Sequence, residues 1–295
     1  DDAEIVLKDH LERLCNAGQY GRLNLTIDKL ADCCEKNKNR EHAILTLQEL
    51  VSHDIHEIVS SALHTLIRMQ HEEENFEKLE HLYEYKIKLE LEKIALELRD
   101  MTDVKAVILS GEKGNFCSGN DIKEKNAFGD GLDLEEARQK NRVGLRMCDA
   151  WTNIPQITVA SIDGACIGGG VSLALSCDFR FCAPSSYFYV PEIELGFTYA
   201  WGTIPKLVSI IGPSKAKLLT ISCKKINTDT LLEWGLCEEV SDNPLSTSKD
   251  FLKKIIVKPL VAQQMVKESI NRQFSMNQIS ILEQDQVLLT RKFKK

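Results

Sequence analysis

The stretch DGACIGGGVS, residues 163–172, comes directly after the mostly apolar run ITVASI at residues 157–162. A short apolar run that ends at glycine predicts a buried strand, and residues 171–177 predict a helix. A helix start without side chains offers free backbone N–H groups and a partial positive charge to an anion. The alternative is a tight turn in which glycine only meets a need for positive φ. The spacing is not GxGxxG, so no nicotinamide dinucleotide site is predicted.

A second glycine turn, NFCSGNDIKE at residues 115–124, follows a second predicted strand at residues 104–109. A third strand is predicted at residues 179–182, and helical patterns lie between the strands. Alternating strands and helices indicate an α/β fold with parallel pairing and right-handed crossovers. Ligands of open α/β sheets bind at the carboxyl ends of strands, so both turns are expected to face one crevice.

Five segments, taken in order, resemble the crotonase (enoyl-CoA hydratase/isomerase) family. They are FCSGNDIKE (116–124), DGACIGGGVSLALSCD (163–178), YVPEIELG (189–196), IGPSKAKLL (211–219) and LEWGLCEEV (232–240). The resemblance implies an α/β fold built as a crotonase-like spiral of ββα-type repeats. It also implies an acyl-CoA substrate, with coenzyme A as part of that substrate and no tightly bound cofactor.

The resemblance implies that the backbone N–H groups of Asn120 and Gly169 polarise the thioester carbonyl. Loss of one such donor typically costs ~100-fold or more in rate. Glu192 is implied as the catalytic acid–base, and apolar neighbours should raise the pKa of its carboxyl. The alternative is a solvated or salt-bridged glutamate, which is the usual state of this residue. The residues expected at the substrate are Ser118, Asn120, Asp121, Ile122, Lys123, Gly168, Gly169, Ser172, Tyr199 and Trp201.

Ser172 occupies the position where the family's hydratases carry a second glutamate. A serine cannot act as a carboxylate base, so Δ3,Δ2-enoyl-CoA isomerisation by one glutamate is the leading expectation. Decarboxylation and atypical hydration stay open, since Tyr199 could donate a proton, although a packing role is the usual one for a buried aromatic. Tyr199 and Trp201 are expected to narrow or reshape the acyl pocket. From another class, the chain could bind acyl-CoA without turnover.

Residues 1–75 predict a helical module, in which residues 21–27 (GRLNLTI) fit a strand as well as a helix. The family's opening strands are not recognisable there. Residues 76–245 form the expected crotonase-like core, and residues 246–295 an amphipathic helical segment for oligomerisation or as a lid. The resemblance implies a homotrimer or hexamer.

The net charge of −7 makes nucleic acid an unlikely partner. No apolar run reaches the roughly 18 residues of a membrane helix. None of the ten cysteines forms a CxxC pair, so reduced thiols in a reducing intracellular compartment are expected, in the cytoplasm or in an organelle matrix after removal of a targeting peptide. All seven histidines precede residue 104, which excludes a Ser-His-Asp device within the crotonase-like part. No metal site is predicted.

Overall fold

The computed structural model describes residues 2–16, 22–37, 40–51, 56–72, 76–112, 114–119, 134–196 and 198–275. The chain divides into two compact units, residues 1–90 and 91–295. The division falls inside helix α5 (Phe76–Asp100), whereas the sequence placed a boundary near residue 75. The first part of α5 belongs with the first unit, where the Ser60 hydroxyl donates to Glu90 Oε1 at 3.2 Å.

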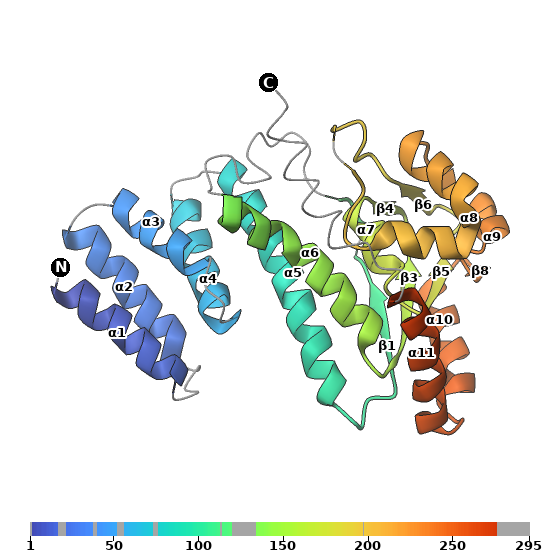
Figure 1. Cartoon of the computed structure of the whole chain (residues 1–295), viewed down its shortest axis with the longest axis horizontal. Coiled ribbons are helices and arrows are strands. Elements are labelled where there is room, and N and C mark those ends of the chain that lie inside the picture. Colours follow the sequence, from blue (N-terminus) through green and yellow to red (C-terminus); the bar gives the residue numbers. More distant parts are fainter. Residues whose placement is uncertain are drawn as a thin grey trace. The chain divides into compact units, whose positions relative to one another are not determined.

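The first unit is helical. Before α5 it contains α1 (Asp2–Asn16), α2 (Leu23–Asn37), α3 (Arg40–Val51) and α4 (His56–Glu72), drawn in blue in Figure 1. Leu23, Ile27 and Leu30 recur at helical spacing on α2 and are fully buried. They pack with Leu47 of α3 and Leu66 of α4, so the unit has a hydrophobic core of its own.

The second unit holds two four-stranded sheets. One contains β1 (Ala106–Ser110), β3 (Ile157–Ile162), β5 (Phe179–Cys182) and β8 (Glu239–Val240), and all of its pairs are parallel. The other contains β2 (Asn115–Cys117), β4 (Ala165–Ile167), β6 (Tyr187–Tyr189) and β7 (Ile226–Asn227), with only the last pair antiparallel.

The helices of the second unit follow the strands in a repeating order. They are α6 (Leu134–Asn153), α7 (Gly169–Ala174), α8 (Thr203–Ile221), α9 (Thr228–Trp234), α10 (Pro244–Ile255) and α11 (Leu260–Ser275). Three times in succession, one strand joins the first sheet, the next joins the second sheet, and a helix follows. This order confirms the predicted α/β class with helices at both ends of the chain.

The central strand β3 is buried along its whole length. Its Ile157 and Val159 pack against Leu252 of α10, whereas Ala160 and Ile162 belong to a cluster that includes Leu207 of α8. Such a strand, covered on both faces, explains why its sequence lacks polar alternation. It also fixes the position of the turn that follows.

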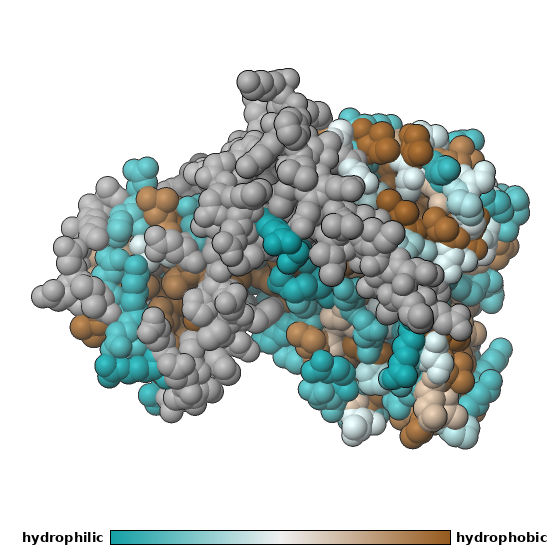
Figure 2. Space-filling view, in the orientation of Figure 1, coloured by the Kyte–Doolittle hydropathy of each residue, from teal (hydrophilic) through white to brown (hydrophobic). Residues whose placement is uncertain are grey.

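No helix within the described ranges is both long and apolar enough to span a bilayer. On the face drawn in Figure 2, apolar side chains of the second unit lie among polar ones.

Candidate active site

Three neighbouring parallel strands, β2, β4 and β6, end at one edge of the second sheet. Cys117 at the end of β2 is paired with Cys166 of β4, and Ile167 at the end of β4 is paired with Tyr189 of β6. Each strand leads into one of the predicted site segments. The register therefore brings together three segments that are far apart in the sequence.

The two glycine turns touch, and their glycines permit this approach. Gly119 has a φ of +80°, and a Cβ built on it would lie 3.2 Å from Ile167 Cγ2. A Cβ on Gly170 would lie 2.5 Å from Cys117 Cβ, closer than side chains come to one another. Both contacts bring the backbone of the first turn up to the start of α7. The two turns, which were expected to face one crevice, are thus in direct contact with each other.

Hydrogen bonds to the N–H and the carbonyl of Gly168 fix the orientation of the peptide that joins Gly168 to Gly169. The Gly168 N–H donates to the Tyr189 carbonyl at 2.8 Å, and the Gly168 carbonyl accepts from the Val171 N–H at 2.9 Å. The Tyr199 hydroxyl donates to the same carbonyl at 3.1 Å. In a planar trans peptide the N–H points opposite to the carbonyl, so these bonds also fix the direction of the Gly169 N–H. As the first residue of α7, Gly169 has an N–H without an intrahelical partner.

The carboxyl group of Glu192 lies beside this peptide. A Cβ on Gly168 would stand 2.9 Å from Glu192 Oε1. Burial raises the pKa of Glu192 from an ordinary value of 4.5 to about 7. Its Oε2 is buried and makes no hydrogen bond within the described part of the chain. A carboxyl group that is half-protonated near neutral pH and has an unengaged oxygen is suited to moving a proton.

Three buried hydroxyl groups form a chain behind the Gly168 carbonyl. Thr203 donates to Ser172 Oγ at 2.7 Å, and Ser172 donates to the Tyr199 hydroxyl at 2.9 Å. Tyr199 in turn donates to the Gly168 carbonyl, as described above. The proton of Tyr199 is therefore engaged with the backbone. This arrangement favours a positioning role over proton donation to a substrate.

The indole of Trp201 fills the space between two glycines. A Cβ on Gly169 would lie 2.2 Å from its ring, and a Cβ on Gly144 of α6 would lie 2.0 Å from it. Trp201 itself has a φ of +63°, which is rare for a bulky residue and costs about 1–3 kcal/mol. The ring rests against the backbone that carries the Gly169 N–H, so it forms one wall beside that donor.

Comparison with known proteins fits this geometry. Residues 82–295 match the family model described as "Enoyl-CoA hydratase/isomerase". The chain belongs to this family. A crystal structure of a Mycobacterium paratuberculosis enoyl-CoA hydratase/isomerase is similar with a TM-score of 0.64 and 21% identity, covering 71% of this chain and 85% of that one.

Two curated relatives of this chain have names that state different reactions. An ethylmalonyl-CoA decarboxylase of Danio rerio is 34% identical over 159 residues, which are 52% of this chain and 49% of that protein. A peroxisomal Δ(3,5)-Δ(2,4)-dienoyl-CoA isomerase of Arabidopsis thaliana is 30% identical over 160 residues, which are 52% of this chain and 58% of that protein. The chain therefore aligns with about half of the length of these relatives.

The structure describes most of the residues that the sequence placed at the site. Gly168, Gly169, Ser172, Tyr199 and Trp201 cluster around the start of α7 with Glu192, and Ser118 immediately precedes Gly119 on the exposed side of the first turn. The predicted residues Asn120, Asp121, Ile122 and Lys123 lie outside the described residues, so their roles stay predictions.

Two contributors to the site were missed in the sequence. Thr203 completes the hydroxyl chain, and a lone threonine gives no signal of such a role. Gly144 receives the Trp201 ring, and its place inside a predicted helix was a usable signal. A glycine in a helix costs about 1 kcal/mol relative to alanine, so it often marks a close approach by another group.

Proposed function

We propose that this protein forms a thioester enolate from an acyl-CoA and moves a proton with Glu192 alone, as a Δ3,Δ2-enoyl-CoA isomerase. The observation that carries the proposal is the carboxyl of Glu192, buried beside the Gly168–Gly169 peptide with one oxygen unengaged among the described residues. Coenzyme A enters as part of the substrate. No tightly bound cofactor takes part in the proposed reaction.

In the proposed reaction the Glu192 carboxylate removes a proton from the α carbon of a 3-enoyl-CoA. The electron pair shifts toward the thioester oxygen, where the Gly169 N–H and the predicted N–H of Asn120 stabilise the negative charge. The resulting carboxylic acid then returns the proton to the γ carbon, which leaves the double bond between the α and β carbons. One carboxylate suffices because it removes the proton from the α carbon and returns it to the γ carbon on the same face of the acyl chain.

Ser172 supports a reaction of this kind over a standard hydration. Its hydroxyl is fully engaged with Tyr199 and Thr203 inside the protein. Addition of water calls for a second proton-transfer group to activate that water. The resemblance places such a group at the position of Ser172, where no carboxylate is available.

Decarboxylation is the second candidate, and the ethylmalonyl-CoA decarboxylase relative favours it. Loss of CO2 from an α-carboxyacyl-CoA leaves the same enolate, and the protonated form of Glu192 would then deliver a proton to the α carbon. Isomerisation begins with the carboxylate form, whereas protonation of an enolate requires the acid form. The two candidates therefore differ in their pH dependence, since the pKa of Glu192 is raised to about 7.

The experiment is NMR of 3-hexenoyl-CoA, crotonyl-CoA and ethylmalonyl-CoA in D2O with the full chain across pH 6–8. Conversion of the 3-enoyl ester, rising as the pH passes about 7, is expected for isomerisation. Release of CO2 that falls over the same range would favour decarboxylation instead. Glu192→Gln should abolish turnover, and the matched variant Glu194→Gln should retain it because Glu194 is exposed. Full turnover by Glu192→Gln would overturn both candidates.

A further inference from the structure

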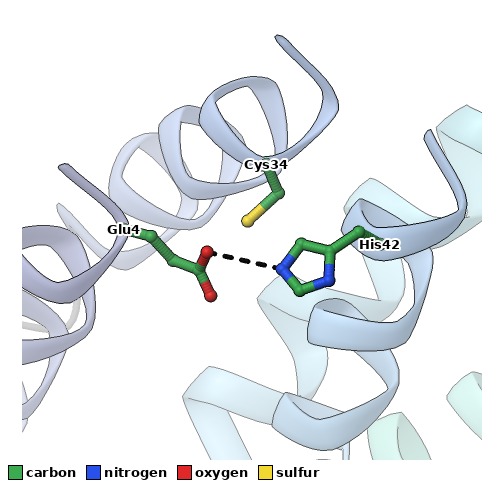
Figure 3. A group of neighbouring side chains, drawn as sticks. All are labelled: Glu4, Cys34 and His42. Atoms are coloured by element: carbon green, nitrogen blue, oxygen red, sulfur yellow. Dashed lines mark hydrogen bonds and ion pairs between the residues drawn. The ribbon is translucent and has the colours of Figure 1, made fainter. Parts of the chain in front are cut away.

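A cluster of potential metal ligands lies in the first unit, which contributes no residue to the proposed active site. Glu4 of α1, Cys34 of α2 and His42 of α3 bring their ligand atoms within 4.8 Å of one another. Figure 3 shows the carboxylate, the thiol and the imidazole converging on one point between the three helices. We propose that Glu4, Cys34 and His42 form a zinc site that links α1, α2 and α3.

The three side chains already point their ligand atoms inward. Glu4 Oε2 lies 3.4 Å from His42 Nε2, and Cys34 is 1% exposed. Ligand atoms around a tetrahedral zinc ion are about 3–4 Å apart, given metal–ligand distances of about 2.0–2.3 Å. The longest of the separations between ligand atoms, up to 4.8 Å, would therefore have to shorten by roughly 1–2 Å to bring the group into coordination.

Neighbouring groups hold the ligands in place. Lys8 pairs with Glu4 Oε1 at 3.2 Å, which leaves Oε2 directed toward His42. Thr46 Oγ1 lies 3.8 Å from Cys34 Sγ, within hydrogen-bonding reach of a sulfur atom. Metal ligands are typically oriented by such outer hydrogen bonds. Both partners come from helices that already supply a ligand, so the geometry is set within the helical core.

The ligand set selects the class of metal. A thiolate disfavours Mg²⁺ and Ca²⁺, which take oxygen ligands, and one sulfur, one nitrogen and one oxygen suit Zn²⁺. A thiolate and a carboxylate together neutralise a divalent ion. Three protein ligands leave the fourth position of a tetrahedron to water. The sequence pattern does not indicate this group, because its members lie on three different helices, up to 38 residues apart.

The test uses the full chain, stripped of metal by chelator, and then titrated with Zn²⁺ or with Co²⁺ as a spectroscopic probe. We expect one ion per chain, a thiolate-to-cobalt charge-transfer band, and the intense visible bands of four-coordinate cobalt. Cys34→Ser should abolish the charge-transfer band. Loss of an outer-shell partner costs about 10–100-fold in metal affinity, so loss of this ligand should cost at least about 100-fold.

Cys33→Ser is the matched control, since Cys33 is the adjacent thiol on the same helix and lies outside the cluster. It should retain both the band and the affinity. His42→Gln tests the site without opening the core, because the His42 side chain is 32% exposed. Zn²⁺ should raise the melting temperature of the wild-type chain and of Cys33→Ser, but not that of His42→Gln. Absence of Zn²⁺ binding at micromolar concentration, or equal losses in Cys33→Ser and Cys34→Ser, would overturn the proposal.

Discussion

Replacing Glu192 by glutamine should change how the stability of the second unit depends on pH. A carboxyl pKa that rises from 4.5 to about 7 on folding corresponds to roughly 3 kcal/mol. Because the folded pKa is the higher one, this contribution is fully present below pH 4.5 and is lost as the pH rises through about 7. Wild-type protein should therefore lose roughly 3 kcal/mol of unfolding free energy between pH 5 and pH 9 that Glu192→Gln does not lose.

The assay is urea denaturation followed by tryptophan fluorescence. All three tryptophans, Trp151, Trp201 and Trp234, belong to the second unit, so the signal reports that unit by itself. The buried glutamine amide will cost about 1–3 kcal/mol if its N–H groups find no partner, but this cost is the same at both pH values. The informative quantity is thus the difference in unfolding free energy between wild type and variant, and how much that difference changes from pH 5 to pH 9.

Glu194→Gln supplies the matched control for this measurement, since Glu194 is exposed two residues further along the same segment. The control variant should follow the pH dependence of the wild type. A Glu192→Gln variant whose stability varies with pH as the wild type does would refute the reasoning. In that case the carboxyl of Glu192 would be ionised in the folded protein at little cost.

Tyr199→Phe should lower kcat by less than the ~100-fold expected for loss of an oxyanion donor, with little change in KM. The control variant Tyr189→Phe should keep full activity. A loss of ~1000-fold or more in Tyr199→Phe would instead identify Tyr199 as a proton donor. Lys267→Met breaks the ion pair of 2.8 Å with Asp178 and should lower the unfolding free energy by about 3 kcal/mol in urea denaturation, and a loss below about 1 kcal/mol would contradict a structural role. Met265 of α11 is an apolar side chain that is 61% exposed, and it should lie in a subunit contact. Met265→Glu should therefore reduce the mass found by light scattering, and a wild-type monomer would contradict this.

The sequence predicted well those features that depend on neighbours along the chain. The buried strand β3 follows from an apolar run in the sequence. The turn after it follows from glycines, which adopt the positive φ that the turn requires. Both are local properties of the sequence. At residues 21–27 the pattern fitted a strand and a helix equally. The structure begins a helix at Leu23, because burial of Leu23, Ile27 and Leu30 on one helical face joins that segment to the core of its unit.

Features made by distant residues could not be predicted in this way. The hydroxyl chain joins Ser172 to Tyr199 and Thr203, which are 27 and 31 residues away. Serine, threonine and tyrosine are common, and nothing in their spacing distinguishes this set from others. The Trp201 ring meets Gly144 and Gly169 only because α6 and α7 lie next to each other. Packing between elements decides such contacts, so a pattern of residues alone does not contain them.

Ser172 is a member of the hydroxyl chain, at the position where the resemblance implies a second carboxylate. A glutamate there would have to be buried behind the Gly168 carbonyl, near the charge of Glu192, and the two would raise one another's pKa. Serine avoids this repulsion and passes a hydrogen bond through Tyr199 to the Gly168 peptide. That bond helps to aim the Gly169 N–H, since carbonyl and N–H belong to one planar peptide. In the proposed mechanism, a hydroxyl at this position supplies no second proton-transfer group and supports the proposed oxyanion donor, which suits a reaction that needs one proton carrier and a firmly held enolate.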